Sequence, residues 1–359
     1  MTQLFDAPAF EGHEAVHLFH DPDSGLRAIV AVHSTVLGPA AGGCRMWPYA
    51  SDQAALDDAL KLSRAMSYKN AVAGLALGGG KSVIIGDHHT AKTPALFEAF
   101  GAAVDSLGGR YWAAEDVGVS PADLAYTRRR TRYVAGLEGH VAASGDPSPV
   151  TAEGVFRGVR LCVWRALNRD LQGVRVAIQG VGHVGGALAD KLAAAGARLI
   201  ITDANPLMAQ LVAARTGAEV VGLDAIFDAE ADVFAPCALG GAISLESLAR
   251  IQAPIIAGAA NNQLAGAEAG QVLFDRGVLY APDYVINGGG IINVAAEIRA
   301  LDRGERFDAG WVESKLARLM LTLETILDRA QDERRPTHQV ADEVAKARIS
   351  EARAARAAA

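Results

Sequence analysis

Two lysines twelve positions apart flank a glycine cluster, and this arrangement is suited to holding a small anion. Lys69 and Lys81 stand on either side of Gly78-Gly79-Gly80 in the segment YKNAVAGLALGGGKSVIIG that begins at Tyr68. Because glycine has no Cβ, a ligand can lie against bare backbone there while the two lysines reach it. A lysine in a dry pocket or beside another cation has a lowered pKa and can act near neutral pH.

Other interpretations of this segment must be weighed. A phosphate-binding loop ending in Gly-Lys-Ser requires glycine at position 75, where the chain has Leu75, and it opens a helix after the lysine. Residues 82–85 are mostly β-branched and predict a strand instead. The simplest alternative is a glycine-rich turn with two surface lysines. An acidic pair, Glu115-Asp116, argues against it, because a partly desolvated carboxylate can shuttle protons.

A complete dinucleotide-binding unit follows in the second half of the chain. Residues 175–179 predict a strand, Gly180-Val181-Gly182-His183-Val184-Gly185 comes directly after it, and a helix is expected to about residue 195. The first glycine makes the turn, the second admits a pyrophosphate, and the third lets the helix pack on the strand. The next strand, 198–202, ends at Asp203, whose carboxylate can accept hydrogen bonds from ribose hydroxyls and so favours NAD.

The sequence His13-Glu14-Ala15-Val16-His17 matches the zinc-peptidase pattern HExxH. That pattern needs a helix, where residues four apart share a face. Here a short β-rich run, a turn at 21–25 and a second apolar run predict a hairpin. On a strand the two histidines lie about 13 Å apart, too far for one zinc. We therefore predict no metal site.

The chain of 359 residues is long enough for two domains. We expect an α/β fold with a mixed-sheet substrate-binding and catalytic domain over residues 1–145 and a Rossmann-type dinucleotide-binding domain over 146–330, joined by a linker at 145–149. Hydroxyl side chains directly before Asp52, Pro94 and Pro121 can cap helix N-termini and predict three helices in the first domain. Residues 337–359 predict one amphipathic helix that can pack back on the first domain or make a subunit contact.

Composition excludes several classes of partner. Half of the residues are apolar and the net charge is −7, so nucleic acid is not expected to bind. The start of the chain has no basic stretch followed by an apolar one, and no apolar run is long enough to span a bilayer. We expect a cytoplasmic protein without membrane contact. Its three cysteines, Cys44, Cys162 and Cys237, lie far apart and are expected to be reduced.

Several motifs together resemble the amino acid dehydrogenases of the Glu/Leu/Phe/Val family, most closely the leucine and phenylalanine enzymes. They cover nearly the whole chain: GPAAGGCRM from Gly38, YKNAVAGLALGGGKS from Tyr68, AEDVG from Ala114, SPVTAEGV from Ser148, GVGHVG from Gly180, APCALGG from Ala235, AGAANNQL from Ala257 and NGGGIINV from Asn287. The chain departs from leucine-type relatives at Cys44, Ala259 and Gly288, where they usually have threonine, serine and alanine.

The resemblance assigns a role to individual residues. Lys81 would be the low-pKa catalytic lysine and Asp116 the acid/base, while Lys69 and Asn262 would hold the substrate carboxylate. The side-chain pocket would be lined by Gly43, Ala41, Ala114, Ile291 and Val294. NAD would be bound by Gly180, Val181, Gly182, His183, Val184, Gly185, Gly186, Asp203, Thr151, Cys237 and Ala238.

The implied reaction is reversible oxidative deamination of an apolar L-amino acid to the 2-oxo acid and ammonia by a homo-oligomer. Glutamate-specific relatives carry a lysine and a hydroxyl where this chain has Ala41 and Val294, so glutamate is expected to be a very poor substrate. Leucine and other branched side chains are expected first, with phenylalanine close behind and tryptophan also open. A non-catalytic NAD-binding protein is the alternative from another class.

Overall fold

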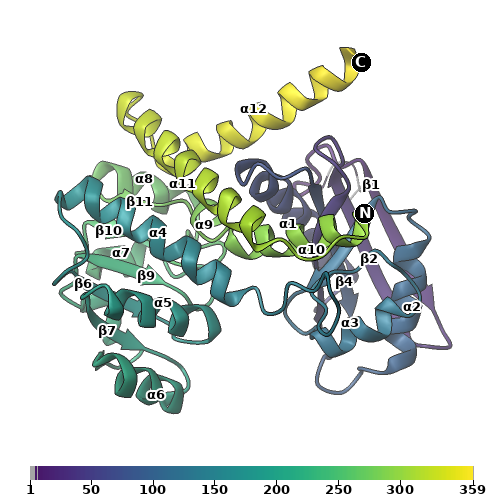
Figure 1. Ribbon diagram of the computed structural model, residues 1–359, viewed down its shortest axis with the longest axis horizontal. Helices are drawn as coiled ribbons and strands as arrows, with labels where there is room; N and C mark the ends of the chain where they lie inside the picture. The colour runs from purple at the N-terminus through teal and green to yellow at the C-terminus, as the bar shows by residue number, and fades with distance from the viewer. Residues whose placement is uncertain (1–4, 6, 359) are drawn as a thin grey trace. The chain divides into compact units, whose positions relative to one another are not determined.

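The computed structural model describes residue 5 and residues 7–358, and the chain forms two compact units (Figure 1). Unit 1 contains the described residues up to Asp146, Ile291–Val312 and those from Ala345 onward; unit 2 contains Pro147–Gly290 and Glu313–Val344. The chain therefore passes between the units four times. This division differs from the expected boundaries at 145 and 330, because 291–312 return to unit 1 and unit 2 continues beyond residue 330. The described residues from Ala345 onward belong to unit 1, which agrees with the expectation that the last helix can pack back on the first domain.

Unit 1 is built on a mixed five-stranded sheet of order β1-β2-β4-β3-β5. The predicted hairpin is confirmed as β1 (Ala15–Asp21) paired antiparallel with β2 (Leu26–Ser34). The antiparallel neighbour of β2 is β4 (Gly78–Ile85). On its other side β4 pairs in parallel with β3 (Ala40–Trp47), which also pairs in parallel with β5 (Tyr111–Glu115).

Hydroxyl caps begin the three helices that follow these strands. Ser51, Thr93 and Ser120 each accept a backbone N–H hydrogen bond in the first turn, at the starts of α1 (Asp52–Val72), α2 (Pro94–Asp105) and α3 (Pro121–Arg128). These are the three starts that the sequence predicted, since such a cap satisfies an N–H group that has no partner in the helix.

The helices cover opposite faces of the sheet. On one face, α1 packs through Ala59 and Leu60 against Ala31 and Val83 of the central strands. On the other, α2 and α3 share a larger apolar core with the strands, in which Phe100 is fully buried. A side chain of β3, β4 or β5 therefore lies either beneath α1 or in the core under α2 and α3.

Unit 2 contains a six-stranded parallel sheet of order β11-β10-β9-β6-β7-β8, as the short apolar runs predicted. Its strands are β6 (Arg175–Gln179), β7 (Arg198–Thr202), β8 (Glu219–Val220), β9 (Val233–Pro236), β10 (Ile255–Ile256) and β11 (Leu279–Tyr280). The chain runs outward from β6 to β8 and then returns to β9 on the other side of β6. Such a reversal creates a crevice at the carboxyl ends of β6 and β9, where open α/β sheets bind ligands.

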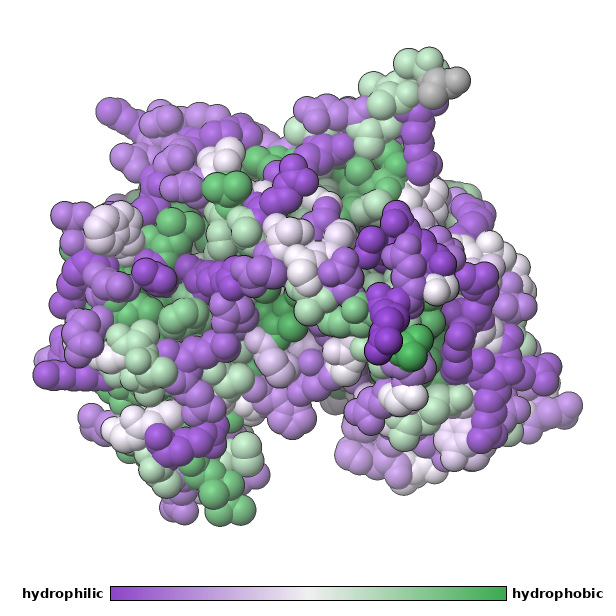
Figure 2. Space-filling view, in the orientation of Figure 1, coloured by the Kyte–Doolittle hydropathy of each residue, from purple (hydrophilic) through white to green (hydrophobic). Residues whose placement is uncertain are grey.

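Helices of unit 2 surround this sheet, and three further helices each contain residues of both units. Those of unit 2 are α4 (Ser148–Leu167), α5 (His183–Ala194), α6 (Pro206–Thr216), the short 3-10 helix η2 (Ala225–Asp228), α7 (Leu245–Arg250), α8 (Ala267–Asp275) and α9 (Asp283–Ile286). They are followed by α10 (Gly289–Arg303), α11 (Ala309–Asp332) and α12 (Thr337–Ala358). The edge helix α6 exposes Leu207 and Leu211, and apolar side chains gather over it in Figure 2.

No helix in the part of the chain that the structure describes is long and apolar enough to cross a bilayer.

Candidate active site

Lys81 and Asp116 meet in unit 1 as an ion pair between Nζ and Oδ2. Lys81 lies in β4 with only 3% of its surface exposed, and Asp116 directly follows β5. The strand between them is β3, where a Cβ on Gly43 would lie 2.8 Å from the Asp116 Cβ and 2.5 Å from the Glu115 carbonyl oxygen. A side chain at position 43 would therefore collide with the Glu115 carbonyl and with the side chain of Asp116.

Strand register puts the predicted pocket residues of the sheet on the same face as Lys81. Gly43 is paired with Ala114, and Ala41 is paired with Gly79, two residues before Lys81. Directly paired residues, and every second residue along a strand, point to the same side of a sheet. Ala41, Gly43, Lys81 and Ala114 consequently share the face that α1 covers.

The glycine cluster serves a different purpose from the one that the sequence suggested. Gly78, Gly79 and Gly80 are buried within β4, and a Cβ on each would collide with atoms of the protein itself. These atoms are the Ser34 carbonyl for Gly78, the α1 backbone at Ser67 for Gly79, and the Tyr111 ring for Gly80. The expectation that a ligand lies against this backbone is wrong, as is the alternative of a turn. Gly79 lets α1 approach β4 closely, and Gly78 and Gly80 leave room for Ser34 and Tyr111, so the strand that carries Lys81 is packed on both faces.

Behind the sheet, a buried polar cluster supports the same strands. The Tyr111 hydroxyl donates to the Gly42 carbonyl at 2.8 Å and lies 2.9 Å from the Ser82 Oγ. Beside it, burial raises the pKa of the Cys44 thiol to about 12, so this cysteine stays protonated and inert. The cluster thus ties β3, β4 and β5 together beneath the Lys81 and Asp116 pair.

Arg45 is a site residue to which the sequence analysis gave no role of its own. Its guanidinium places Nη2 3.5 Å from Asp116 Oδ1 and Nη1 2.9 Å from Asp58 Oδ2. Asp58 also accepts a hydrogen bond from the Tyr49 hydroxyl at 2.5 Å. Strand alternation could have found it, because Arg45 stands two residues after Gly43 and so points to the same face.

The environment of Lys81 lowers its pKa to about 7. Burial is the largest cause, and the positive charges of Arg45 and Lys69 add to it, whereas Asp58 opposes them. Lys81 can therefore gain or lose a proton near neutral pH. This agrees with the low pKa that the sequence suggested for it.

Lys69 lies half-buried near the end of α1, and that end is fixed from two sides. Next to it, the Asn70 Nδ2 donates to the Gly78 carbonyl at the start of β4. The guanidinium of Arg348 in α12 donates to the carbonyls of Ala71 and Val72. A cation at a helix C-terminus satisfies carbonyls that have no partner in the helix. Lys69 is thus presented from a rigid helix end.

The remaining predicted pocket residues of unit 1 lie on α10. Ile291 and Val294 are buried and three positions apart, so they share one face of the helix. The fully buried Glu297 anchors α10 to the preceding chain by accepting hydrogen bonds from the backbone N–H groups of Leu137 and Ser144. A buried carboxylate with several donors holds a segment firmly.

The HExxH histidines do not form a metal site. His13 is buried, and its Nε2 lies 2.9 Å from Ser63 Oγ and 3.0 Å from the Leu60 carbonyl oxygen. His17 lies in β1. His13 therefore has a structural contact with α1, as expected for a histidine that packs in a core.

In unit 2, the glycine loop after β6 is closely packed at Gly180 and Gly185 and open at Gly182. Gly180 has φ +93°, and a Cβ there would lie 2.8 Å from that of Ala238. Gly185 packs closely enough that its Cβ would lie 3.1 Å from that of Cys237, whereas a Cβ on Gly182 would meet nothing within 4 Å. The space beside Gly182 is open, and α5 begins there without a side-chain cap, so its first N–H groups can face phosphate oxygens.

Asp203 is fixed beside this loop. Its Oδ2 accepts the Val181 N–H at 2.8 Å and its Oδ1 accepts the Asn205 N–H at 2.8 Å. Each carboxylate oxygen retains another lone pair, so Asp203 can also accept from ribose hydroxyls. The loop and Asp203 lie at the carboxyl ends of β6 and β7, and Cys237 follows β9.

Other predicted cofactor and substrate residues of unit 2 lie near helix starts and in a loop. His183, Val184 and Gly186 form the first turn of α5, and the Thr151 hydroxyl in the first turn of α4 donates to the Pro147 carbonyl at 2.9 Å. Asn262 is exposed in the loop after β10, with φ +50°. Asn262 belongs to unit 2 and Lys69 to unit 1.

Comparison with known proteins identifies the family. The family model "Glu/Leu/Phe/Val dehydrogenase, dimerisation domain" matches residues 13–133, and "Glutamate/Leucine/Phenylalanine/Valine dehydrogenase" matches residues 204–357. The chain belongs to the Glu/Leu/Phe/Val dehydrogenase family.

Individual relatives of this dehydrogenase differ in the substrate that they are named for. Leucine dehydrogenase of Thermoactinomyces intermedius is 44% identical over 348 residues, covering 97% of this chain and 93% of the relative. Phenylalanine dehydrogenase of Bacillus thermotolerans is 45% identical over 297 residues, covering 81% and 78%. The crystal structure of L-tryptophan dehydrogenase from Nostoc punctiforme superimposes with a TM-score of 0.82 at 39% identity, covering 95% and 97%.

The dehydrogenase is accordingly an oxidoreductase that acts on the CH–NH2 group of an amino acid, and its family uses a nicotinamide cofactor. The open space at Gly182 and the uncapped start of α5 fit such a dinucleotide. The expected two-domain α/β architecture is confirmed, with a mixed sheet in unit 1 and a parallel sheet in unit 2.

Proposed function

We propose that this dehydrogenase catalyses NAD-dependent, reversible oxidative deamination of an apolar L-amino acid, with leucine and other branched side chains as the preferred substrates. The observation that carries the proposal is the pair of Lys81 and Asp116, closed across Gly43 in a buried site where the pKa of Lys81 is about 7. A protein that only binds a dinucleotide has no need of such a pair.

Proton transfers at this site follow from the residues present. Asp116 accepts a proton from the substrate ammonium group, which gives the neutral amine that can lose the Cα hydrogen as hydride. The bound nicotinamide supplies the hydride acceptor. Water then adds to the iminium carbon and gives up a proton to the neutral Lys81 amine, and the Lys81 ammonium that results stabilises the negative charge that develops on the new oxygen. The remaining hydroxyl proton passes to solvent as the carbonyl forms. Asp116 returns its proton to nitrogen as ammonia leaves, and Lys69 with Asn262 holds the substrate carboxylate.

NAD is the proposed cofactor rather than its 2′-phosphorylated form. The Asp203 carboxylate would repel a 2′-phosphate, and residues 204–206, Ala-Asn-Pro, offer no cation to offset that repulsion. The hydrogen bonds from Val181 and Asn205 keep this charge beside the glycine loop.

The substrate side chain is proposed to be apolar because Ala41, Ala114 and Val294 offer no partner for a charge. A carboxylate buried against them without a partner would lose several kcal/mol. The similarity to leucine dehydrogenase favours branched aliphatic substrates. An aromatic substrate is the second candidate, since Ala41 leaves more room than a leucine would and a tryptophan dehydrogenase is among the similar structures.

The test is to mix the purified protein with NAD and a panel of L-amino acids at alkaline pH and to follow NADH absorbance. We expect leucine, valine and isoleucine to give the highest rates and glutamate almost none. Lys81→Met provides the background, because it removes the amine while keeping an apolar chain of similar length. If no amino acid gives turnover above this background, the proposed activity is refuted and the alternative of a non-catalytic NAD-binding protein is favoured.

We further propose a homo-oligomer. The family model that matches residues 13–133 describes a dimerisation domain, and this segment contains all five strands of the unit 1 sheet. Analytical ultracentrifugation should give a mass that is a multiple of 37.4 kDa, and a sedimenting species of that mass itself would refute the proposal.

A further inference from the structure

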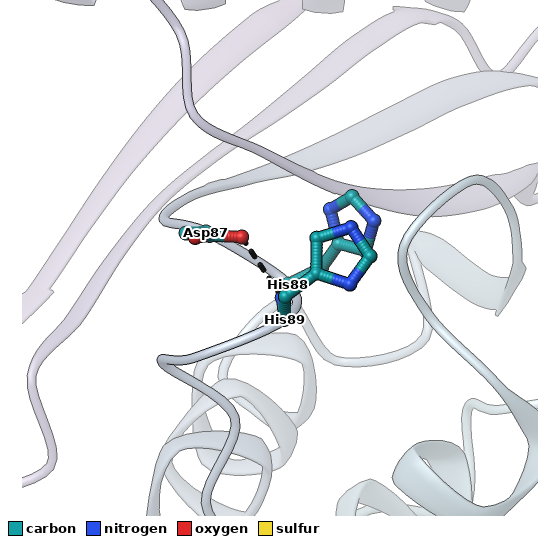
Figure 3. Close-up of side chains that lie close together, drawn as sticks. All are labelled: Asp87, His88 and His89. Atoms are coloured by element: carbon teal, nitrogen blue, oxygen red, sulfur yellow. Dashed lines mark hydrogen bonds between the residues drawn. The ribbon is translucent and has the colours of Figure 1, made fainter.

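Three side chains with metal-binding groups gather in the loop that follows β4. Asp87, His88 and His89 each offer one ligand atom, and these atoms lie within 4.8 Å of one another. The two imidazole rings lie one over the other on the same side of the loop, with centroids 4.0 Å apart (Figure 3). Among the residues that the structure describes, no other group of three His, Cys, Asp or Glu side chains meets this geometry.

The surroundings of the loop fix two of the three side chains. Trp47 stacks on the His88 ring at 5.5 Å between centroids and 19° between planes. On the backbone side, the His88 Cβ lies 3.2 Å from where a Cβ on Gly118 would stand. The Asp87 carboxylate accepts hydrogen bonds from the His89 N–H at 2.9 Å and from the Thr90 hydroxyl at 3.2 Å. Ligands held in place by neighbours lose little freedom when a metal binds.

One polar atom of the cluster lacks a partner. The Nδ1 of His88 is buried and makes no hydrogen bond. Buried polar atoms are nearly always paired, and an exception calls for a ligand, an ion or a water molecule. No protein group accounts for this buried nitrogen of His88, so a ligand or an ion is needed to pair with it.

We propose that Asp87, His88 and His89 form a binding site for a transition-metal dication, Zn²⁺ above all. Two imidazoles and one carboxylate are the ligands that zinc and its neighbours prefer, whereas Ca²⁺ and Mg²⁺ favour oxygen ligands alone. Three protein ligands leave the fourth tetrahedral position to water. With Zn–N bonds of about 2.1 Å, ligand atoms in a tetrahedral site stand roughly 3.4 Å apart. The ligand atoms lie within 4.8 Å of one another, and rotation of the exposed His89 side chain can bring them to the tetrahedral spacing.

The site is separate from the catalytic pair: its loop follows the carboxyl end of β4, whereas Lys81 lies within that strand and Asp116 follows β5. His88 packs beside Gly118 in the turn where the Val119 N–H donates to the Asp116 carbonyl at 2.9 Å. None of the three ligands is Lys81, Lys69 or Asp116. Metal binding can therefore be measured without dehydrogenase turnover, and its failure would leave the proposed reaction unaffected.

Direct titration tests the proposal. Tag-free protein, stripped with a chelator and dialysed, is titrated with Zn²⁺ by calorimetry and with Co²⁺ by visible absorbance. We expect one equivalent to bind saturably, and His88→Phe and His89→Gln each to weaken binding at least 10-fold. His88→Phe retains an aromatic ring against Trp47, so loss of packing does not confound the loss of a ligand. His20→Gln, which removes an exposed histidine outside the cluster, should bind as the parent does.

Thermal unfolding gives an independent measurement. A metal that binds only the folded chain raises the Tm, and the rise grows with the logarithm of the free metal concentration relative to its Kd. Zn²⁺ should raise the Tm of the parent and of His20→Gln but not that of the His88→Phe, His89→Gln double variant. The proposal is overturned if the double variant binds Zn²⁺ as tightly as the parent, or if the parent takes up no equivalent saturably.

Discussion

Lys81 in β4 and Asp116 after β5 form their ion pair across an intervening strand, β3, and the residue of β3 beneath the pair is Gly43. The catalytic groups thus come from two strands that are not neighbours, and the absence of one side chain lets them meet. This explains why the segment GPAAGGCRM matters to the site although most of its residues carry no charge.

Gly43→Ala tests this relationship. The added methyl would stand 2.8 Å from the Asp116 Cβ and 2.5 Å from the Glu115 carbonyl oxygen, so Asp116 must shift from its present position beside Lys81. We expect kcat to fall at least 10-fold, since small displacements of catalytic groups have large effects on rate. Gly222→Ala is the control, because a Cβ there meets nothing within 4 Å. An unchanged kcat in Gly43→Ala would show that the pair does not depend on this space.

The roles of the three charged residues should separate in steady-state kinetics. Lys81→Ala and Asp116→Asn remove charge stabilisation and proton transfer, which act in the transition state, so each should lower kcat by orders of magnitude. Lys69→Ala removes a contact that is equal in ground and transition states and should mainly raise KM. The exposed Lys61 of the same helix provides the control Lys61→Ala. A near-normal kcat in Lys81→Ala would refute the mechanism.

The pH dependence of the reaction should report the pKa of Lys81. With a pKa of about 7, Lys81 is mostly protonated below pH 7 and neutral above it. Because the neutral amine can accept a proton as water adds, kcat/KM for deamination should rise with pH through this region. Arg45 is among the causes that lower this pKa, so Arg45→Gln should raise it and shift the rising limb toward alkaline pH.

Arg27→Gln is the matched control for the pH profile, since Arg27 is exposed and pairs with Asp52 away from the site. Its rising limb should coincide with that of the parent. A limb in Arg45→Gln that stays at the parent's position, or moves toward acid, would show that Arg45 does not set the protonation of Lys81.

Asp203 should control the choice between the two nicotinamide dinucleotides. The parent is expected to show a much higher kcat/KM with NAD than with NADP, because the carboxylate repels a 2′-phosphate. Asp203→Asn keeps an oxygen that can accept one of the two backbone hydrogen bonds but removes the charge. The ratio of kcat/KM for NAD to that for NADP should therefore fall toward one. Equal use of both cofactors by the parent would contradict the prediction.

Local features of the fold could be predicted from the sequence, whereas contacts between distant segments could not. The hydroxyl caps at Ser51, Thr93 and Ser120 and the strand limits of β6 and β7 depend on neighbouring residues, and they were predicted correctly. The filling of the space beside Gly78–Gly80 depends on Ser34, α1 and Tyr111, which come from other parts of the chain. The return of residues 291–312 to unit 1 likewise depends on long-range contacts of α10.

The candidate site shows the same division. Lys81 and Asp116 were predicted from residue type and motif. The sequence does not show the order of the strands in the sheet, and so it could not show that β3 lies between β4 and β5. Arg45 received no role because its partners, Asp58 and Asp116, lie 13 and 71 positions along the chain. The sequence analysis considered the HExxH histidines for metal binding and did not consider the adjacent His88 and His89. Of these two pairs, only His88 and His89 lie close to a carboxylate in a group that could hold a metal.

The preferred side chain should depend on Ala41, which is 1% exposed on the same sheet face as Lys81. Replacing it with leucine adds three carbons to a confined space, and each missing or added methylene changes discrimination by about 1–3 kcal/mol. Measured kcat/KM for leucine, valine, phenylalanine, tryptophan and glutamate should show a larger loss for the aromatic substrates than for the aliphatic ones in Ala41→Leu. Ala50→Leu, at an exposed position, should leave all five values unchanged. An equal loss for aromatic and aliphatic substrates would mean that Ala41 does not line the side-chain pocket, and the choice between leucine and a larger substrate would then depend on Ala114, Ile291 and Val294.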